Sequence, residues 1–206
     1  METRSVRSYR LRGSRITPSQ ATALDRFWPI YGVEIPEGKL DLPALFPDSK
    51  EIVMEIGFGM GEATAYIGQD FPDVGFLAVD VHFPGVGKLM ARIEELGLTN
   101  IRIMETDAHI LFEEHLEDQS LDGIHLFFPD PWPKERHQKR RLTNRRFLKI
   151  YEDLLTENGE IHMKTDNKTL FDYSLEEIMF YDMELITITR DLHNSDVNCN
   201  IMTEFE

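Results

Sequence analysis

Cysteine is almost missing from this sequence of 206 residues: Cys199 is the only one, so no internal disulfide can form. Such a chain suits a reducing compartment, and we expect a cytoplasmic protein. No apolar run is long enough to cross a bilayer, and the N-terminus lacks the apolar stretch of a secretory signal. The seven histidines are scattered without paired ligand spacing, so neither a membrane anchor nor a structural metal is expected.

Positive charge is also in short supply, because 22 basic residues stand against 37 acidic ones and the net charge is −15. Taken alone, this balance argues against a nucleic-acid partner. Two segments depart from it: residues 1–15 hold five arginines and one glutamate, and residues 134–149 hold eight basic side chains and one glutamate. The sequence therefore predicts a polarised molecule, in which an acidic body would meet phosphate groups only through these two basic segments.

The chain divides into two unequal parts. Residues 1–48 are predicted to form a basic arm and a proline-rich connector, with a short helix that begins at Thr17 and Pro18. Residues 49–206 alternate short apolar strands with amphipathic helices, which is typical of a mostly parallel α/β sheet with helices on both faces. Predicted strands cover residues 51–56, 75–81, 101–105, 121–128, 160–165 and 184–190, and predicted helices cover 62–70, 85–97, 108–115, 143–156 and 167–180, with Asn158 and Gly159 ending the fourth of these helices.

A glycine-rich turn, made by Gly57, Gly59 and Gly61, closes the first predicted strand and opens the first helix. Such a turn lets a ligand approach the backbone, but alone it is compatible with NAD, FAD or S-adenosylmethionine. Glu55 stands just before the glycines, where its charge would repel a pyrophosphate and attract the cationic amino-acid end of S-adenosylmethionine. Asp80 ends the next predicted strand, where a carboxylate can accept both ribose hydroxyls. The combination favours the methyl donor.

Asp107 ends the third predicted strand at the same carboxyl edge of the sheet. Ligands of open α/β sheets bind outside that edge, so this carboxylate is a candidate for reading the adenine amino group. It could also cap the helix that follows, and the two roles are compatible.

The segment after the fourth predicted strand, residues 127–134, has prolines at positions 129, 131 and 133. These stiffen the loop, so Asp130 and Trp132 are expected to be held at the mouth of the cofactor site. Trp132 could stack on an extruded base, or it could only pack the loop onto the sheet. The basic run that follows, residues 136–141, is predicted to face RNA, with an ordinary solvated face as the alternative.

With these motifs the sequence resembles the bacterial tRNA (guanine-N7)-methyltransferase family, known as TrmB. The resemblance implies a class I S-adenosylmethionine-dependent, Rossmann-like methyltransferase fold. It also implies methyl transfer to N7 of guanosine 46 in the variable loop of tRNA. The matching segments are residues 55–61, 80–82, 106–108, 127–134, 136–141, 165–167 and 203–206.

The resemblance implies a role for each matching residue. Asp130 would be the catalytic residue, and the protein would work as a monomer or homodimer without an obligate protein partner. Asp166 would contact the substrate, although it could instead cap the following helix. The implied cofactor-binding residues are Glu55, Gly57, Gly59, Gly61, Asp80, Asp107 and Asp130; the substrate-binding residues are Lys134, Asp166, Thr203, Glu204, Phe205 and Glu206; and the tRNA-contacting residues are Arg136, His137, Lys139, Arg140 and Arg141.

Two features depart from the family pattern. Members usually continue beyond the 203–206 segment into a final strand beside residues 184–190, whereas this sequence stops at Glu206, so an unpaired sheet edge is expected. Asp80 also stands where many members have glutamate, which shortens the reach of the carboxylate.

Three other functions are weighed against this one. A methyltransferase of the same fold could act on protein or a small molecule, but the basic run after Trp132 argues against it. An NAD(P)-dependent oxidoreductase is disfavoured by Glu55, and a non-catalytic tRNA-binding protein is disfavoured by the presence of all the proposed cofactor carboxylates.

Overall fold

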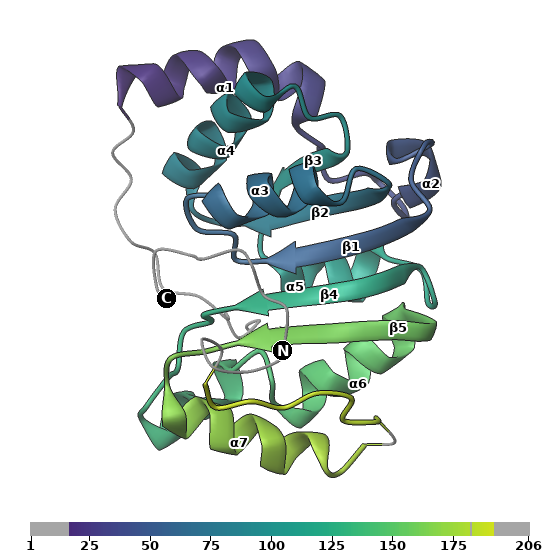
Figure 1. Ribbon diagram of the computed structural model, residues 1–206, viewed down its shortest axis with the longest axis vertical. Coiled ribbons are helices and arrows are strands. Elements are labelled where there is room, and N and C mark those ends of the chain that lie inside the picture. The colour runs from purple at the N-terminus through teal and green to yellow at the C-terminus, as the bar shows by residue number, and fades with distance from the viewer. Residues whose placement is uncertain (1–16, 182, 192–206) are drawn as a thin grey trace.

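The computed structural model describes residues 17–181 and 183–191, which fold around a five-stranded parallel sheet (Figure 1). The strand order is β3-β2-β1-β4-β5, and every neighbouring pair is parallel. The order reverses between β1 and β4, so the turn after β1 and the loop after β4 meet at the carboxyl edge, where ligands bind in such sheets. The strands are β1 (Glu51–Ile56), β2 (Val74–Asp80), β3 (Ile101–Glu105), β4 (Leu121–Phe127) and β5 (Leu155–Lys164).

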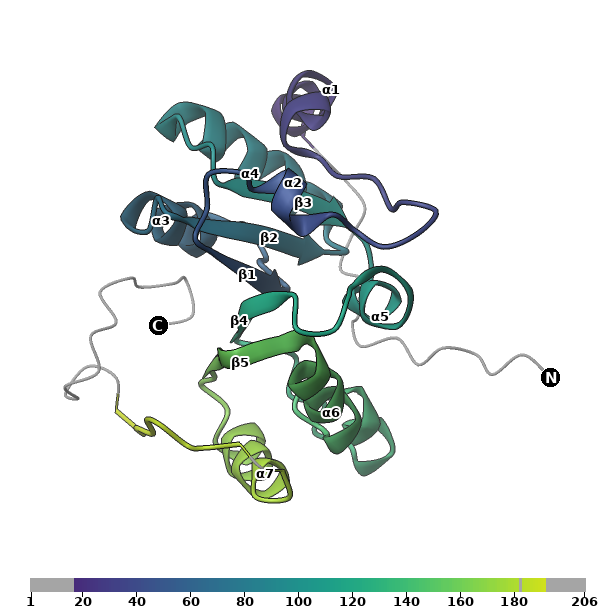
Figure 2. The same cartoon turned by 90° about the vertical axis from the view of Figure 1, so that its right-hand side faces the viewer.

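Helices cover both faces of the sheet (Figure 2). One face carries α3 (Glu62–Asp70) and α4 (Phe83–Leu96), with α1 (Pro18–Tyr31) packed against α4. The opposite face carries α5 (Ala108–Ile110) and α6 (Arg145–Leu154), and α7 (Lys168–Ile178) lies beside α6. The shorter elements are α2 (Leu42–Leu45), the π-helical turn η1 (Leu111–His115) and the 3-10 helix η2 (Glu135–Arg140).

Alternate strand residues enter two separate core layers. Met54 and Ile56 of β1 pack with α6, whereas Val53 packs with α4. Because β1, β2 and β3 are mostly buried on both faces, they read as nearly continuous apolar runs, as expected for a parallel sheet, whereas the edge strand β5 is polar and half-exposed. The predicted α/β class and five of the six predicted strands are confirmed. None of the helices in the described part of the chain combines the length and the apolar character needed to span a membrane.

The predicted cap at Asn158 and Gly159 is wrong, because α6 already ends at Leu154 and both residues belong to β5. Leu155 turns directly into extended backbone and pairs with Leu121 of β4. The last carbonyls of α6 accept hydrogen bonds from the amides of residues 119 and 120, at 2.9 Å each. A tertiary contact therefore replaces the local glycine cap.

The predicted strand at residues 184–190 is also wrong, since these residues form no strand. They run beside α7 instead, where the Arg190 guanidinium donates to Asp172 at 2.8 Å and lies over the Phe171 ring (Figure 1). Leu185 and Ile186 are 51% and 68% exposed. The alternating pattern is present, but no strand within the described residues pairs with it and buries its apolar side.

Candidate active site

The turn after β1 is open on the side of its first two glycines. Gly57, Gly59 and Gly61 have φ angles of 80°, 58° and 75°, a region in which side chains are costly. The Gly57 amide donates to the Val79 carbonyl at 2.8 Å, which fixes the turn to β2. A Cβ atom added at Gly57 or Gly59 would meet no atom within 4 Å. The turn therefore forms a cradle that a ligand can approach at backbone distance.

Asp80 ties this turn to the start of α4. One carboxylate oxygen accepts from the Gly59 amide and the other from the His82 amide, each at 2.8 Å. Burial raises the pKa of Asp80, while these two backbone donors act in the opposite direction. Each oxygen has a further lone pair, so the arrangement is compatible with the predicted ribose contact.

Glu55 is the most deeply buried acid of the site, with only 2% of its surface exposed. Burial raises the pKa of Glu55 to about 7; the Thr64 hydroxyl acts to lower it, and the charge of Asp80 raises it further. Oε2 of Glu55 has no hydrogen-bond partner, and no lysine or arginine within residues 17–181 and 183–191 pairs with it. An ammonium group would supply the missing donor and countercharge, so these residues fit the amino-acid end of S-adenosylmethionine and not a pyrophosphate.

Asp107 caps the helix after β3, which was one of the two roles predicted for it. Its side chain accepts from the His109 amide at 3.1 Å. The preceding residue, Thr106, donates its amide to the Asp80 carbonyl at 3.1 Å, which keeps the ends of β2 and β3 together. Contact with adenine stays a prediction that this position permits.

The loop after β4 holds Asp130 between two strained residues. Phe128 and Trp132 have φ angles of +50° and +41°, which non-glycine residues rarely adopt. The Phe128 amide donates to the Lys164 carbonyl at 2.8 Å, so the loop is fixed to β5 on this side. Asp130 itself is half-buried. Strain of this kind persists only where the surroundings impose it, and it concentrates at functional sites.

Trp132 packs against the basic helix η2. The Arg140 guanidinium lies 4.9 Å from the centre of the indole ring, and the His137 imidazole approaches edge-on at 5.7 Å. These contacts favour packing of the loop over base stacking as the role of Trp132.

Most of the predicted nucleic-acid residues lie at the surface. Lys134, Arg136 and Lys139 are exposed, and none of the η2 residues is buried. His137 and Arg140 are half-buried by their contacts with Trp132. The sequence therefore predicted correctly where a basic surface stands, directly after the Asp130 loop.

Arg141 is the exception, because it is only 2% exposed. Its guanidinium donates to the carbonyls of Pro131 and Trp132. The prediction that Arg141 contacts RNA is therefore wrong for this conformation, because its guanidinium is buried and donates to carbonyls inside the protein.

The capping role considered for Asp166 is wrong too, since Asn167 caps α7 by accepting from the Leu170 amide at 2.9 Å. Asp166 is exposed beside it, so the capping alternative no longer competes with the substrate contact. The predicted substrate residues Thr203, Glu204, Phe205 and Glu206 lie outside the described residues.

Sequence reasoning missed Gly85, which lets α4 pack on the glycine turn. A Cβ atom there would lie 1.8 Å from the Gly59 carbonyl oxygen, so no side chain fits while the turn stays in place. The signal was present, because a glycine inside a helical pattern usually has a packing reason.

We expect Gly85→Ala to lower the free energy of unfolding by about 1–3 kcal/mol, because the added methyl forces α4 away from the turn. Urea denaturation measures this, and S-adenosylhomocysteine should bind more weakly. Gly38→Ala is the control, because a Cβ atom at that position meets nothing within 4 Å. Equal stability of the two variants would show that the turn moves at no cost.

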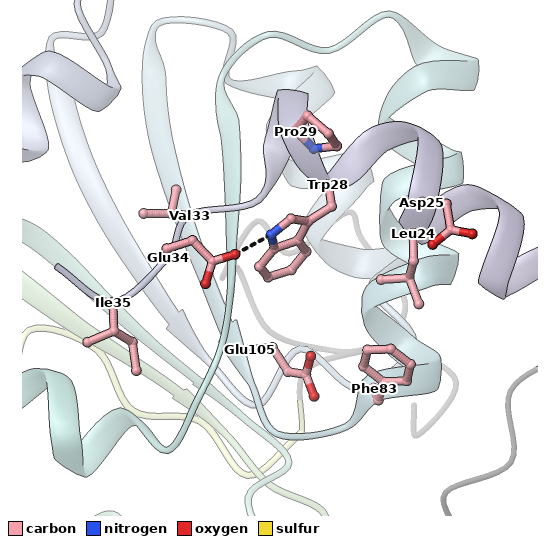
Figure 3. Close-up of a pocket in the computed structure, with 9 residues that line it drawn as sticks. All are labelled: Leu24, Asp25, Trp28, Pro29, Val33, Glu34, Ile35, Phe83 and Glu105. Carbon is pink, nitrogen blue, oxygen red and sulfur yellow. Dashed lines mark hydrogen bonds between the residues drawn. The ribbon is translucent and has the colours of Figure 1, made fainter.

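A separate cavity of about 620 Å³ lies between α1, the residues that follow it and the end of β3 (Figure 3). The rings of Trp28 and Phe83 face it, and the Trp28 indole donates to Glu34 at 2.6 Å. Glu34, Glu105 and Asp25 make its lining acidic. None of the predicted cofactor residues lines this cavity, and its carboxylates would repel an RNA backbone.

The strand order, the open glycine turn and the buried Glu55 define a class I, Rossmann-like methyltransferase. Two solved structures share this fold: an antibiotic-related methyltransferase (TM-score 0.53, 15% identity, 72% of this chain and 73% of that one) and an aminoglycoside resistance methyltransferase (TM-score 0.50, 18% identity, 68% and 66%). Residues 49–206 match the family model described as "Putative methyltransferase". The chain belongs to the bacterial tRNA (guanine-N7)-methyltransferase family.

Three relatives that carry the name tRNA (guanine-N(7)-)-methyltransferase illustrate the similarity. The protein of Streptomyces avermitilis is 50% identical over 163 residues, which cover 79% of this chain and 56% of the relative. That of Neisseria meningitidis serogroup A is 46% identical, covering 87% of this chain and 75% of the relative. That of Nitrosomonas eutropha is 40% identical, covering 90% and 83%.

Proposed function

We propose that the protein transfers the methyl group of S-adenosylmethionine to N7 of guanosine 46 in the variable loop of tRNA, in the cytoplasm. The observation that carries the proposal is Asp130, held on a strained loop at the carboxyl edge where the strand order reverses between β1 and β4, with the basic helix η2 directly after it. The names of the relatives support the base and the atom. Position 46 rests on the family resemblance.

The cofactor would be held by acids from three neighbouring strands. S-adenosylmethionine, when bound, supplies an electrophilic methyl group on a positively charged sulfur. Glu55 would hold its ammonium group, Asp80 the ribose hydroxyls and Asp107 the adenine amino group. Burial raises the pKa of Glu55 and that of the half-buried Asp80, so a nearby positive charge would favour the ionised form of both acids.

The target atom needs little chemical activation from the protein. Guanine N7 has an in-plane lone pair and no proton, so no general base has to act on it before transfer. Positioning then supplies most of the rate, and correct placement of two reactants is worth roughly 7–11 kcal/mol. Asp130 would accept from guanine N1–H and the exocyclic amine, and its charge would offset the positive charge that develops on the purine.

The charge distribution supports a separate RNA-facing surface. Arg136 and Lys139 would meet the phosphate backbone, Lys134 would contact the guanosine or its surroundings, and the acidic body would not face the RNA. We further propose that residues 1–48 act as a basic arm and connector, and residues 49–206 as the catalytic domain. The enzyme would act as a monomer or homodimer without another protein partner, which light scattering tests.

The function is tested by incubating the protein with unmodified tRNA and labelled S-adenosylmethionine, followed by chemical cleavage specific to 7-methylguanosine. We expect cleavage at position 46, and no cleavage there in a control tRNA that has adenosine at position 46. Label at another base, or in protein or a small molecule only, would contradict the proposal. Binding of a nicotinamide cofactor in place of S-adenosylhomocysteine would support an oxidoreductase.

Charge reversal on η2 tests the RNA surface. Each phosphate contact that is lost should reduce the slope of log affinity against log salt by about 0.7–0.9, so Arg136→Glu combined with Lys139→Glu should reduce it by about twice that. Filter binding at several salt concentrations measures the slope. Lys50→Glu is the matched control, because Lys50 is an exposed cation before β1, paired with Asp73. Equal slopes for the double η2 variant and for Lys50→Glu would show that the RNA does not contact η2.

A further inference from the structure

Arg141 is a charged side chain buried beneath the Asp130 loop. Its Nε donates to the Pro131 carbonyl at 2.9 Å, and its Nη2 donates to the Trp132 carbonyl at 3.4 Å. These are the first two carbonyls after Asp130. Burying a guanidinium costs free energy unless its N–H groups donate hydrogen bonds. Moving the Pro131 and Trp132 carbonyls away from Arg141 would therefore destabilise the protein.

The other side of the Arg141 guanidinium is held by α7. The Tyr173 ring centre lies 4.3 Å from the central carbon of the guanidinium, in a cation–π contact. Next to it, the hydroxyls of Thr143 and Ser174 are 2.7 Å apart, and both residues are buried. The Ser174 hydroxyl also donates to the Leu170 carbonyl at 2.8 Å. Arg141 therefore connects the loop after β4 to α7. The helix α7 is itself attached to Thr143, two residues after Arg141, through the hydroxyl of Ser174.

We infer that Arg141, clamped against Tyr173, is a positioning residue that sets the place of Asp130 by holding the two carbonyls that follow it. The inference rests on the proposed function, because it assigns Arg141 to the placement of the catalytic acid. Phe128 is fixed to β5 through the Lys164 carbonyl, so Asp130 is held from both sides. The strained φ angle of Trp132 is one that this clamp helps to impose.

Lysine cannot reproduce this arrangement. A guanidinium presents donors in a rigid planar fork that reaches two carbonyls while its face stacks on a ring, whereas an ammonium group is a single point charge. Arg141→Lys keeps the positive charge and most of the aliphatic volume, so it removes the fork without removing the cation.

The decisive experiment compares Arg141→Lys with Arg102→Lys. Arg102 on β3 is a matched control, because its guanidinium also donates to two carbonyls, those of Thr99 and Ile101 at 3.0 and 2.9 Å, and also lies over a ring, that of Phe46. The strand β3 is at one edge of the sheet, and two strands separate it from β4 and the Asp130 loop. We expect Arg141→Lys to lower kcat by about 10- to 100-fold, because displacements near 1 Å have such effects. Affinities for S-adenosylhomocysteine and tRNA should change by less than about threefold. Arg102→Lys should leave kcat unchanged.

Loop order is measured independently of activity. The protein has two tryptophans, so Trp28→Phe leaves Trp132 as the only tryptophan, and excitation at the red edge of the absorption band avoids the six tyrosines. In that background Arg141→Lys should raise acrylamide quenching of Trp132, and Arg102→Lys should not. Tyr173→Leu, which removes the ring and leaves Arg141 in place, should raise the quenching as well.

Three outcomes overturn the inference. Weaker tRNA binding with a lower salt slope and unchanged kcat at saturation would make Arg141 an RNA contact. A loss of kcat no larger than that of Arg102→Lys, at equal fractions of folded protein, would make its role merely structural. Unchanged Trp132 quenching would mean that the loop does not depend on the clamp, and this readout stands even if tRNA proves not to be the substrate.

Discussion

Replacing Asp130 by asparagine is expected to lower the single-turnover methylation rate by about 100- to 1,000-fold, which is the usual effect of removing one preorganised electrostatic partner. The amide keeps the size of the side chain and one acceptor oxygen, but it loses the negative charge that would offset the charge developing on the purine. The loop is held by the hydrogen bond from the Phe128 amide to the Lys164 carbonyl and by the Arg141 guanidinium at the carbonyls after Asp130, so the substitution should not reshape it.

S-adenosylhomocysteine should bind Asp130→Asn within about threefold of its normal affinity, since Glu55, Asp80 and Asp107 are unchanged. Rapid-quench methylation assays and calorimetry measure the two quantities. Asp118→Asn is the matched control, because Asp118 is an exposed residue in the turn at the opposite end of β4. A variant with full turnover would remove Asp130 from the mechanism, and a large loss of cofactor affinity would make it chiefly a cofactor ligand.

The parts of the site that follow local rules could be predicted from the sequence. Apolar runs predicted β1 to β4, and glycines at a strand end predicted the turn, in which the structure gives all three glycines positive φ angles. Since carboxyl ends of parallel strands meet at one edge, the strand positions of Glu55, Asp80 and Asp107 already implied a common site. Asp107 also caps its helix, as its place before a helical stretch suggested.

The parts that depend on tertiary contacts could not be predicted. Arg141 stands in a basic run whose other members are exposed or half-buried, and only the packing of α7 behind the loop makes it a buried hydrogen-bond donor. Asn158 and Gly159 look like a helix end, but the pairing of Leu155 with Leu121 draws the chain into β5 before them. The alternation at residues 184–190 indicates a strand, yet a strand forms only where a neighbouring strand offers its backbone.

The Glu55 carboxylate should make cofactor binding depend on pH. With its pKa near 7, Glu55 is mostly protonated at pH 6 and mostly ionised at pH 8, so affinity for S-adenosylhomocysteine should rise about tenfold between them. Binding at pH 6.5 should release protons, which calorimetry in buffers of different ionisation enthalpy detects. Glu55→Gln should bind weakly at every pH and release no protons. A flat affinity profile for the unaltered protein would mean that Glu55 does not meet the ammonium group.

The same carboxylate is expected to reduce the stability of the free protein. Its pKa is raised from 4.5 in an ordinary setting to about 7 in the fold, so the folded state binds more protons between these values. The free energy of unfolding therefore falls as pH rises through this window, by about 3 kcal/mol in all, and the loss persists above pH 7. Glu55→Gln has no such group, so it should become more stable than the unaltered protein by a margin that grows by about 3 kcal/mol from pH 4.5 to pH 8.

Urea denaturation of both proteins across this pH range measures the margin, with Glu51→Gln as the control on an exposed residue of the same strand. The control should show a small difference that does not vary in this way. Saturating S-adenosylhomocysteine should abolish most of the pH-dependent margin, because the ammonium group restores the countercharge that Glu55 lacks. If the difference in unfolding free energy between Glu55→Gln and the unaltered protein is the same at pH 8 as at pH 4.5, the carboxylate already has a partner in the free protein. If Glu55→Gln is the more stable protein, the carboxylate does not serve folding, and its role is to bind a cation. The stability lost by burying Glu55 is then the free energy that a bound ammonium group can recover.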